Sequence, residues 1–468
     1  MLFIAIIIIY FILALVLVIG LLLNGVRPSK TLAWLLAIFT IPIGGVLLYL
    51  LLGRNRRKNK LFNLKSDYLT DIHSPLNQES VKRHPDNRKI IKLISKTSNY
   101  PLTHQNQVKI LKDGKETFES IFSALENAKH HIHIQYYIYE DGILANKLLQ
   151  LFKKKVEEGV KIRLLYDGIG SYSLSKKHIK NLQKIGVEVH QFLPFRFGRL
   201  LSSINYRNHR KIIVIDGYVG FTGGINVSDK YLIGDEALGN WHDIHSRIQG
   251  KAANYLDRIF VADWCLAGGE KVESLKHSKT ISTEKNGMEV QIVPSGPDDD
   301  FATMEQVYFS IINNAEKYVY IINPYIIPNH AILQSLQTAA LSGIDVRILM
   351  STSTDIKVVD WCVRAYFESY LKAGIKLYLY PDGFLHSKVV ISDDQIVSVG
   401  TANLDERSLQ QNYEVNAIIY NNELCRNMKE DFLMDCSKSI LLDLETHQKR
   451  PWSTKILEGS AKLLSPLL

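Results

Sequence analysis

The sequence predicts an α/β protein whose two pseudo-symmetric lobes follow an N-terminal transmembrane helical hairpin. Three observations lead to this prediction. Two uncharged apolar stretches occupy residues 2–23 and 31–52, strand and helix patterns alternate from about residue 107, and one polar motif occurs twice. The chain has 468 residues, which is enough for about two to three domains.

The composition favours an anionic partner. The net charge is +9, which suits nucleic acid or an acidic membrane surface, and charge alone does not choose between them. The four cysteines show no CxxC or Cys/His spacing, so neither a zinc site nor a disulfide framework is predicted. We expect buried, reduced thiols.

The two apolar stretches are each long enough to span a bilayer, which takes about 20 residues. A cleaved signal peptide is the alternative for the first stretch, but no basic segment precedes it and no clear cleavage site follows. The basic run RNRRKNK (54–60) outweighs the two charges of NGVRPSK, so we expect it to stay in the cytoplasm. This predicts a multi-pass cell-membrane protein with two spans, residues 1–60, and a cytoplasmic globular part.

The globular part begins after a polar, irregular linker at residues 61–106. QVKIL (107–111) is a short strand, and apolar residues recur at helical spacing from Phe118 to Ala128. A strand at 132–138, a helix that ends at Gly159 and a strand at 160–166 follow. This βαβ rhythm predicts a largely parallel sheet covered by helices.

The same rhythm returns later in the chain. ENAKHHIHIQYYI matches NNAEKYVYIINPY, GVKIRLL matches GIDVRIL, and KIGVEVHQF matches KAGIKLYLY at a nearly constant offset. A repeat unit of this length can bury its own core, so it indicates a duplicated lobe. We predict a first lobe at 107–275, a second lobe at 287–440 and a tail at 441–468 that lies on the membrane or packs on the domain.

Each lobe carries one copy of the polar motif. Either copy alone could be a buried strand with charged flanks, but two matching copies of so polar a pattern rarely arise by chance. Both have HxKxxxxD spacing, followed by a glycine and an asparagine at equal distances. The residues are His209, Lys211, Asp216, Gly223 and Asn226 in the first copy, and His386, Lys388, Asp393, Gly400 and Asn403 in the second.

Two converging copies would form an anion site that suits phosphoryl transfer. Residues i and i+2 of a strand share a face, so each histidine and its lysine point to the same side. One neutral imidazole can attack phosphorus while the other, protonated, gives its proton to the leaving oxygen. The lysines and asparagines would hold the non-bridging oxygens. Because the lysines supply positive charge, we expect neither a metal nor another cofactor.

The paired HxKxxxxDx₆GxxN pattern resembles the phospholipase D superfamily over about residues 107 to 440. The apolar N-terminal pair, NYRNHRK, VPSGPDDD and NPYIIPN resemble bacterial cardiolipin synthases within it. The resemblance implies lobes built of mixed sheets flanked by helices. It also implies transfer of a phosphatidyl group from one phosphatidylglycerol to another with release of glycerol, with His209 as nucleophile and His386 as acid and base.

The resemblance places further residues. Asp216 and Asp393 belong to the catalytic motif, although both look more structural than chemical. The downstream acids map to Glu414 in NYE and, with different spacing, to Asp243 in NWHD, and they would orient the histidines. Thr401 stands where the first copy has a glycine, which we expect to alter one phosphate-oxygen contact.

Other functions stay open at this point. Related proteins hydrolyse phospholipids or nucleic acids with the same site, and an inactive membrane scaffold is a third alternative. A membrane tether raises the local concentration of lipid head groups, which argues against a nuclease. We therefore expect phosphatidylglycerol and the membrane as partners and no nucleic acid, with a homo-oligomer possible.

Two segments have competing interpretations. FLPFRFGRLLSSINYRN (192–208) is longer than its counterpart in the second lobe. Its apolar residues either pack on the core or dip into the membrane interface while its arginines meet lipid phosphates. SGPDDD (295–300) resembles a metal site only superficially, and we expect a solvated turn.

Overall fold

The computed structural model describes residues 10, 12–19, 28–41, 43–49, 85–193, 206–272 and 287–465. The chain forms two compact units, one with the N-terminal helices and one with both lobes. Most of the insertion before the first motif, residues 194–205, and the basic run 54–60 lie outside the described residues.

The N-terminal unit contains short helices. Residues 12–19 are helical, and the second apolar stretch forms α2 (Pro28–Thr40) and α3 (Gly44–Leu48). Ile43, which precedes α3, has a φ of 67°. Since a right-handed helix needs negative φ, α2 and α3 are separate helices. None of the helices in the described ranges is long and apolar enough to cross a membrane.

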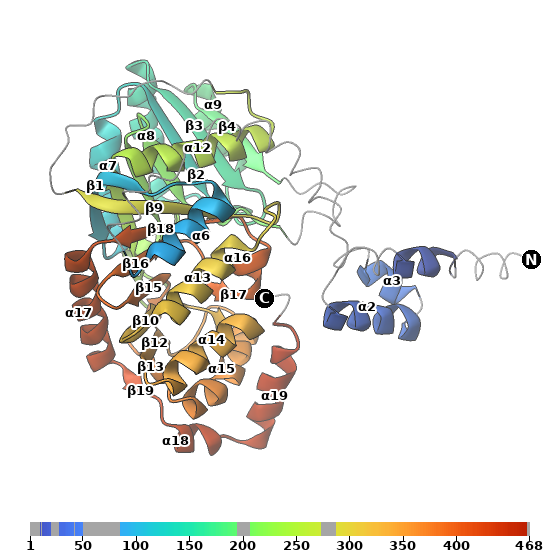
Figure 1. The fold of residues 1–468 in the computed structure, drawn as a ribbon. Coiled ribbons are helices and arrows are strands. Elements are labelled where there is room, and N and C mark those ends of the chain that lie inside the picture. Colours follow the sequence, from blue (N-terminus) through green and yellow to red (C-terminus); the bar gives the residue numbers. More distant parts are fainter. Residues whose placement is uncertain are drawn as a thin grey trace, which may run out of the picture. The chain divides into compact units, whose positions relative to one another are not determined.

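A 15-stranded sheet runs through both lobes (Figure 1). The strand order of the first lobe is the mirror of that in the second, and the antiparallel pair β1–β9 joins them. The first lobe contributes β1 (Thr103–Leu111), β8 (His245–Gln249), β6 (Val219–Gly223), β5 (Ile212–Ile215), β2 (His131–Tyr136), β3 (Lys161–Asp167) and β4 (Glu188–Phe192). The second contributes β9 (Met288–Ser295), β18 (Glu414–Tyr420), β16 (Ile396–Gly400), β15 (Val389–Ser392), β10 (Tyr318–Ile322), β12 (Asp345–Ser351), β13 (Lys376–Tyr380) and β19 (Ile440–Leu441).

The sheet is mixed, so the expectation of a largely parallel sheet is wrong. The outer strands β2, β3 and β4 are parallel, as are β10, β12 and β13. The inner strands of each lobe are antiparallel because each motif strand turns back at once. Asp216 and Gly217 have φ values of 51° and 65°, and Asp393 and Asp394 have 53° and 55°, which makes tight turns.

Helices cover both faces of the sheet in each lobe. α7 (Gly114–Glu126), α8 (Ile143–Glu157) and α9 (Lys176–Lys184) enclose one core of the first lobe, and α12 (Lys251–Leu266) encloses the other. In the second lobe, α13 (Thr303–Asn314), α14 (His330–Leu341) and α15 (Lys357–Lys372) take one face, and α17 (Asn422–Lys438) takes the other. The α/β architecture, with two lobes and mixed sheets, agrees with what the family resemblance implies.

Two segments have more structure than the sequence predicts. Residues 88–98, expected to be irregular, form helix α6 (Arg88–Ser98), and its Ile90, Ile91 and Ile94 are buried in the core of the second lobe. The tail forms α18 (Leu444–Gln448) and α19 (Trp452–Lys462), and α19 packs along α15. The domain limits themselves stay predictions.

Candidate active site

The two motif histidines lie where the lobes meet, and each is held by the other lobe's backbone. The His209 amide donates to the Tyr413 carbonyl at 2.9 Å. In the same way, the His386 amide donates to the His242 carbonyl at 2.8 Å, where β14 (Phe384–Leu385) pairs in parallel with β7 (Trp241–His242). Each carbonyl thus belongs to the residue just before a predicted orienting acid.

This pairing crosses the two acids between the lobes. His209 Nδ1 lies 3.0 Å from both carboxylate oxygens of Glu414, which comes from the second lobe. His386 Nδ1 lies 2.8 Å from Asp243 Oδ2, which comes from the first lobe. Both carboxylates are fully buried. A carboxylate that accepts from Nδ1–H leaves the unprotonated Nε2 of a neutral ring as the reactive nitrogen.

The two lysines lie beside the histidines. Lys211 Nζ donates to the His209 carbonyl at 2.8 Å, and Lys388 Nζ donates to the His386 carbonyl. Both side chains are buried, and burial lowers the pKa of Lys211 to about 7 and that of Lys388 to about 8. Each lysine also acts on the histidine of the opposite lobe, so the four groups form one electrostatic centre.

Burial and the neighbouring lysines keep both imidazoles neutral. Burial, with the charges of Lys211 and Lys388, holds the pKa of His209 well below its usual value. Burial and Lys388 lower the pKa of His386 to about 4, although Asp243 opposes the shift. Burial raises the pKa of Glu414 to about 7, opposed by Lys211 and by a hydrogen bond from Thr401. Such displaced pKa values are frequent at catalytic centres.

The residue two positions before the asparagine differs between the two motif copies, Gly224 in the first and Thr401 in the second. Both asparagines are buried. The side-chain oxygen of Asn226 accepts from the Ile138 amide at 3.2 Å. The Thr401 hydroxyl donates to Glu414, and its expected effect on a phosphate contact stays a prediction. At the matching position, a Cβ on Gly224 would lie 2.1 Å from Asp243 Oδ1, so only glycine leaves room for that carboxylate.

Asp216 and Asp393, the aspartates of the two motif copies, accept hydrogen bonds from backbone amides. Asp216 accepts from the amides of Lys129, His130 and His131 at 2.7 to 2.9 Å. Asp393 accepts from three consecutive amides at residues 316–318 over the same distances. Each aspartate is separated from its histidine by a whole motif strand, roughly 13 Å for four residues.

Sequence reasoning missed residues that complete the site. The Tyr231 hydroxyl, from α11 (Lys230–Ile233), lies 3.1 Å from His386 Nδ1, beside Asp243. Tyr137 meets the His209 ring edge-on with 4.9 Å between centroids. Its aromatic run offered a signal, but the sequence favoured a half-buried strand over a ligand wall. A lone tyrosine in a short helix such as KYLI carries no recognisable pattern.

A buried ionic network supports the segment before β5 that holds His209. Both carboxylate oxygens of Asp263 lie 2.7 Å from Arg210 Nη1, and Arg210 Nε donates to the Glu414 carbonyl at 3.0 Å. Asp298 is buried, and its charge acts on Arg210, so the expected solvated turn is wrong at that residue. The network links both lobes directly behind the histidines.

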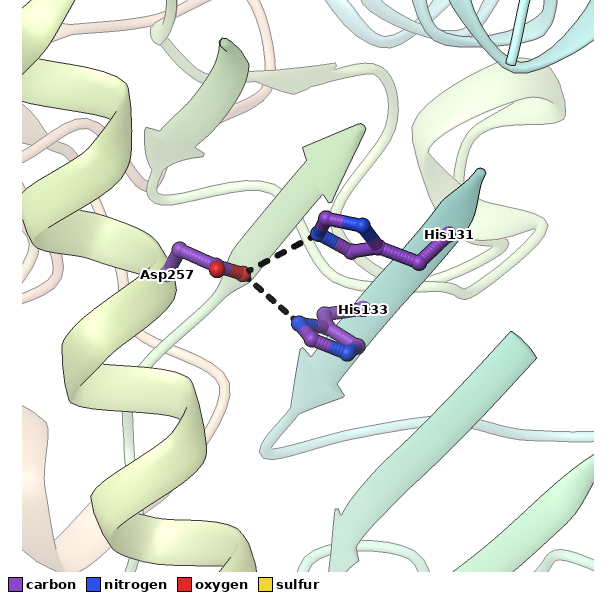
Figure 2. Close-up of side chains that lie close together, drawn as sticks. All are labelled: His131, His133 and Asp257. Carbon is purple, nitrogen blue, oxygen red and sulfur yellow. Dashed lines mark hydrogen bonds and ion pairs between the residues drawn. The ribbon is translucent and has the colours of Figure 1, made fainter. Parts of the chain in front are cut away.

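A second histidine cluster lies between β2 and α12. His133 Nδ1 lies 2.6 Å and His131 Nε2 lies 3.8 Å from Asp257 Oδ1 (Figure 2), and the spacing of the three groups would admit a metal ion. However, His133 Nε2 already lies 3.1 Å from an Arg163 N–H. A metal on Nδ1 would move the ring proton to Nε2, where it would face this donor. The donor set therefore does not fit a metal.

The second lobe packs in the same way without histidines. Tyr318 and Tyr320 take the places of the two histidines on β10, and Lys429 of α17 lies over the Tyr318 ring. Tyr320 stacks on Phe432 as His133 stacks on Phe260. The cluster thus belongs to the contact of α12 with β2, which corresponds to the contact of α17 with β10 in the second lobe.

Comparison with known proteins supports the assignment of the family. Residues 121–264 and 308–436 match the family described as "Cardiolipin synthase, PLD-like domain", and residues 3–54 match "Phospholipase_D-nuclease N-terminal". The chain is 40% identical over 449 residues to a cardiolipin synthase of Geobacillus kaustophilus (strain HTA426), covering 94% of this chain and 89% of the relative. The chain belongs to the cardiolipin synthase family of the phospholipase D superfamily.

Further relatives agree with this membership. Cardiolipin synthase 2 of Bacillus anthracis is 40% identical over 452 residues, covering 94% of this chain and 87% of the relative. Phosphatidylserine synthase from Haemophilus influenzae Rd KW20 shares the fold with a TM-score of 0.61 at 16% identity, covering 81% of this chain and 100% of that one. The family resemblance read from the motifs is confirmed.

Proposed function

We propose that the protein is a phosphatidyltransferase that makes cardiolipin from two phosphatidylglycerol molecules and releases glycerol. The observation that carries the proposal is the crossed pair of dyads, His209 with Glu414 and His386 with Asp243, around one cationic centre. The names of the relatives support the lipid substrate.

In the first step, His209 Nε2 attacks the phosphorus of the donor lipid. The P–N bond forms, the bond from phosphorus to the head-group glycerol oxygen breaks, and His386 gives that oxygen a proton. Glu414 stabilises the positive ring that results. The depressed pKa of His209 keeps its ring neutral, which a nucleophilic imidazole requires.

In the second step, a head-group hydroxyl of the acceptor lipid attacks the phosphohistidine. His386, now neutral, takes the hydroxyl proton, and the P–N bond breaks to regenerate His209. Lys211, Lys388, Asn226 and Asn403 hold the non-bridging oxygens in both steps. Attack by water instead would produce phosphatidic acid, so exclusion of water decides between transfer and hydrolysis.

The product analysis tests the proposed reaction. Supplied with phosphatidylglycerol in vesicles, the protein should accumulate cardiolipin and glycerol in equal amounts. Phosphatidic acid as the main product would identify a hydrolytic phospholipase D, and cleavage of single-stranded DNA without lipid turnover would identify a nuclease.

A trapping experiment tests the order of the histidines. Both His209→Ala and His386→Ala should abolish turnover, because neither residue can replace the other. Labelled phosphatidylglycerol should still form a slow covalent adduct on the His386→Ala protein. An adduct on the His209→Ala protein would reverse the assignment.

We further propose that the N-terminal residues anchor the enzyme. Two apolar stretches, the basic run 54–60 and the family match over residues 3–54 support a hairpin with both ends in the cytoplasm. Impermeant thiol labelling of single cysteines placed at residue 27 and residue 58 tests this, since only the first should react from outside intact cells.

A further inference from the structure

The C-terminal helix α19 buries a charged side chain and exposes large apolar ones. Its inward face contains Glu458 and Ala461, which are 2% and 4% exposed, and packs along α15. Its outward face presents Trp452, Ile456 and Leu463, which are 75%, 56% and 81% exposed. Spacings of four and seven residues put these three on one side of the helix, and we call them the outer stripe.

The inward polar group is satisfied, so the orientation of the helix is stable. Glu458 Oε2 accepts from Arg450 Nε at 2.8 Å, and Ala461 belongs to the core of the second lobe. Burying the outer stripe would require the helix to rotate about its axis. That rotation would separate Glu458 from Arg450 and break their ion pair. The apolar groups therefore stay on the surface, where a soluble protein rarely gathers large ones.

The charges around the outer stripe are basic. The segment 449–465 contains Lys449, Arg450, Lys455 and Lys462 against the single acid Glu458, which is already paired. Lys455 is exposed on the same helix, while the Lys462 ammonium lies over the ring of Tyr366 on α15. A tryptophan and aliphatic stripe in a basic segment is typical of a helix that lies in the interface of an anionic bilayer.

Helix α19 lies beside α15 in the second lobe (Figure 1). Lys462 Nζ lies 4.3 Å from the ring centroid of Tyr366, whose hydroxyl interacts with Ser465 and with the charge of Glu406. Glu406 begins α16 (Glu406–Gln410), and the next residue, Arg407, acts electrostatically on His209.

We propose that the outer stripe of α19 is a membrane-contact surface that inserts into the interface of an anionic phospholipid bilayer. The proposal rests on the proposed function in one respect: the surface that the outer stripe contacts is the bilayer that holds the lipid substrate. It adds a contact in the second lobe, separate from the N-terminal residues.

Depth-dependent quenching tests the contact directly in the full chain. An environment-sensitive fluorophore is attached at Ile456→Cys, or at Met434→Cys on α17 as a control of matched exposure, 55%. A Cys265→Ser background removes the half-exposed native thiol. In vesicles of phosphatidylcholine and phosphatidylglycerol with a nitroxide lipid, residue 456 should be quenched several-fold more than residue 434. Equal quenching at both would overturn the proposal.

Paired serine variants measure what the contact does. Ile456→Ser with Leu463→Ser should lower turnover on vesicles several-fold and leave turnover of a short-chain, water-soluble phosphatidylglycerol unchanged. The control pair, Leu341→Ser with Met434→Ser, removes two residues of similar exposure, 73% and 55%, and should change neither rate. Equal loss on both substrates would contradict a membrane role.

Two further outcomes separate the alternatives. A disulfide between copies through Cys at residue 456 would assign the outer stripe to a contact between two chains and overturn the proposal. If the native chain turned over neither substrate, the proposed function would fail, yet quenching at residue 456 would still decide the membrane contact.

Discussion

Replacing Glu414 by glutamine should disable His209 without disturbing the fold. The amide oxygen can take the place of Oε1, where it accepts from Asn412 Nδ2 and from His209 Nδ1–H. The amide nitrogen then takes the place of Oε2 and donates to the Thr401 hydroxyl, which can turn to accept. The hydrogen bond from His209 Nδ1–H to Oε1 survives, whereas its contact with Oε2 and the negative charge are lost.

The size of the effect follows from the charge. When His209 attacks phosphorus its ring becomes positive, and Glu414 lies 3.0 Å from Nδ1. Two unit charges about 4 Å apart interact by about 4 kcal/mol at an effective dielectric constant of 20. At about 1.4 kcal/mol per tenfold, Glu414→Gln should slow formation of the phosphohistidine by about 10³.

The pH dependence of this loss has a definite sign. The pKa of Glu414 is raised to about 7, so the carboxyl is neutral below that pH and resembles the glutamine. The ratio of native to Glu414→Gln rates should therefore rise as pH increases from about 6 and level off above about 8. A ratio that falls over this range would contradict the assigned pKa shift.

Asp243→Asn provides the matched comparison, because it acts on the proposed general acid. A single-turnover assay with phosphatidylglycerol should show a large loss for both variants. With a p-nitrophenyl phosphatidyl ester, whose leaving group departs without a proton, Asp243→Asn should recover most of its rate and Glu414→Gln should not. The opposite pattern would exchange the two histidines, and losses below about tenfold for both would make the carboxylates structural.

Three other predictions concern the cationic centre. Lys211→Met should abolish turnover yet raise the free energy of unfolding by about 1–3 kcal/mol, because burial lowers the folded-state pKa to about 7. This gain grows as pH falls from about 10 to 7, so thermal melts should show a larger increase at pH 7 than at pH 9. Binding of a soluble phosphodiester should take up about one proton at pH 7, since His386 has a pKa of about 4 and must be charged to act as the acid. Calorimetry in buffers of different ionisation enthalpy measures this uptake, and no uptake would contradict the role of His386. Chelator should leave activity largely intact, whereas complete loss restored by a divalent ion would disprove the metal-free mechanism.

Sequence reasoning identified the residues of the site because the motif is local and repeated. His209 and Lys211 lie two apart, and their counterparts His386 and Lys388 repeat that spacing. The antiparallel return after the first motif was overlooked, although Asp216–Gly217 between two apolar runs is a typical hairpin signal. The apolar spacing within residues 90–94 likewise predicts a helix, but the polar residues around it hid α6.

The crossing of the acids could not be predicted from spacing. It depends on the pairing of Tyr413 with the segment before His209, and of β7 with β14, which joins residues far apart in the chain. These contacts arise only when the lobes pack across the β1–β9 junction. A pattern within one lobe predicts which residue is an acid, but it does not predict which histidine the acid reaches.

The crossing makes each lobe incomplete and also allows the two halves to differ. A lobe by itself would hold a histidine whose carboxylate partner lies in the other lobe. Gly224 leaves space for the short Asp243 next to His386, whereas Thr401 adds a hydroxyl to the longer Glu414 next to His209. Because a displacement through phosphohistidine needs one nucleophile and one acid, identical environments would serve neither role well. Fusing two diverged lobes in one chain lets each histidine have its own carboxylate, and the catalytic asymmetry follows from that difference.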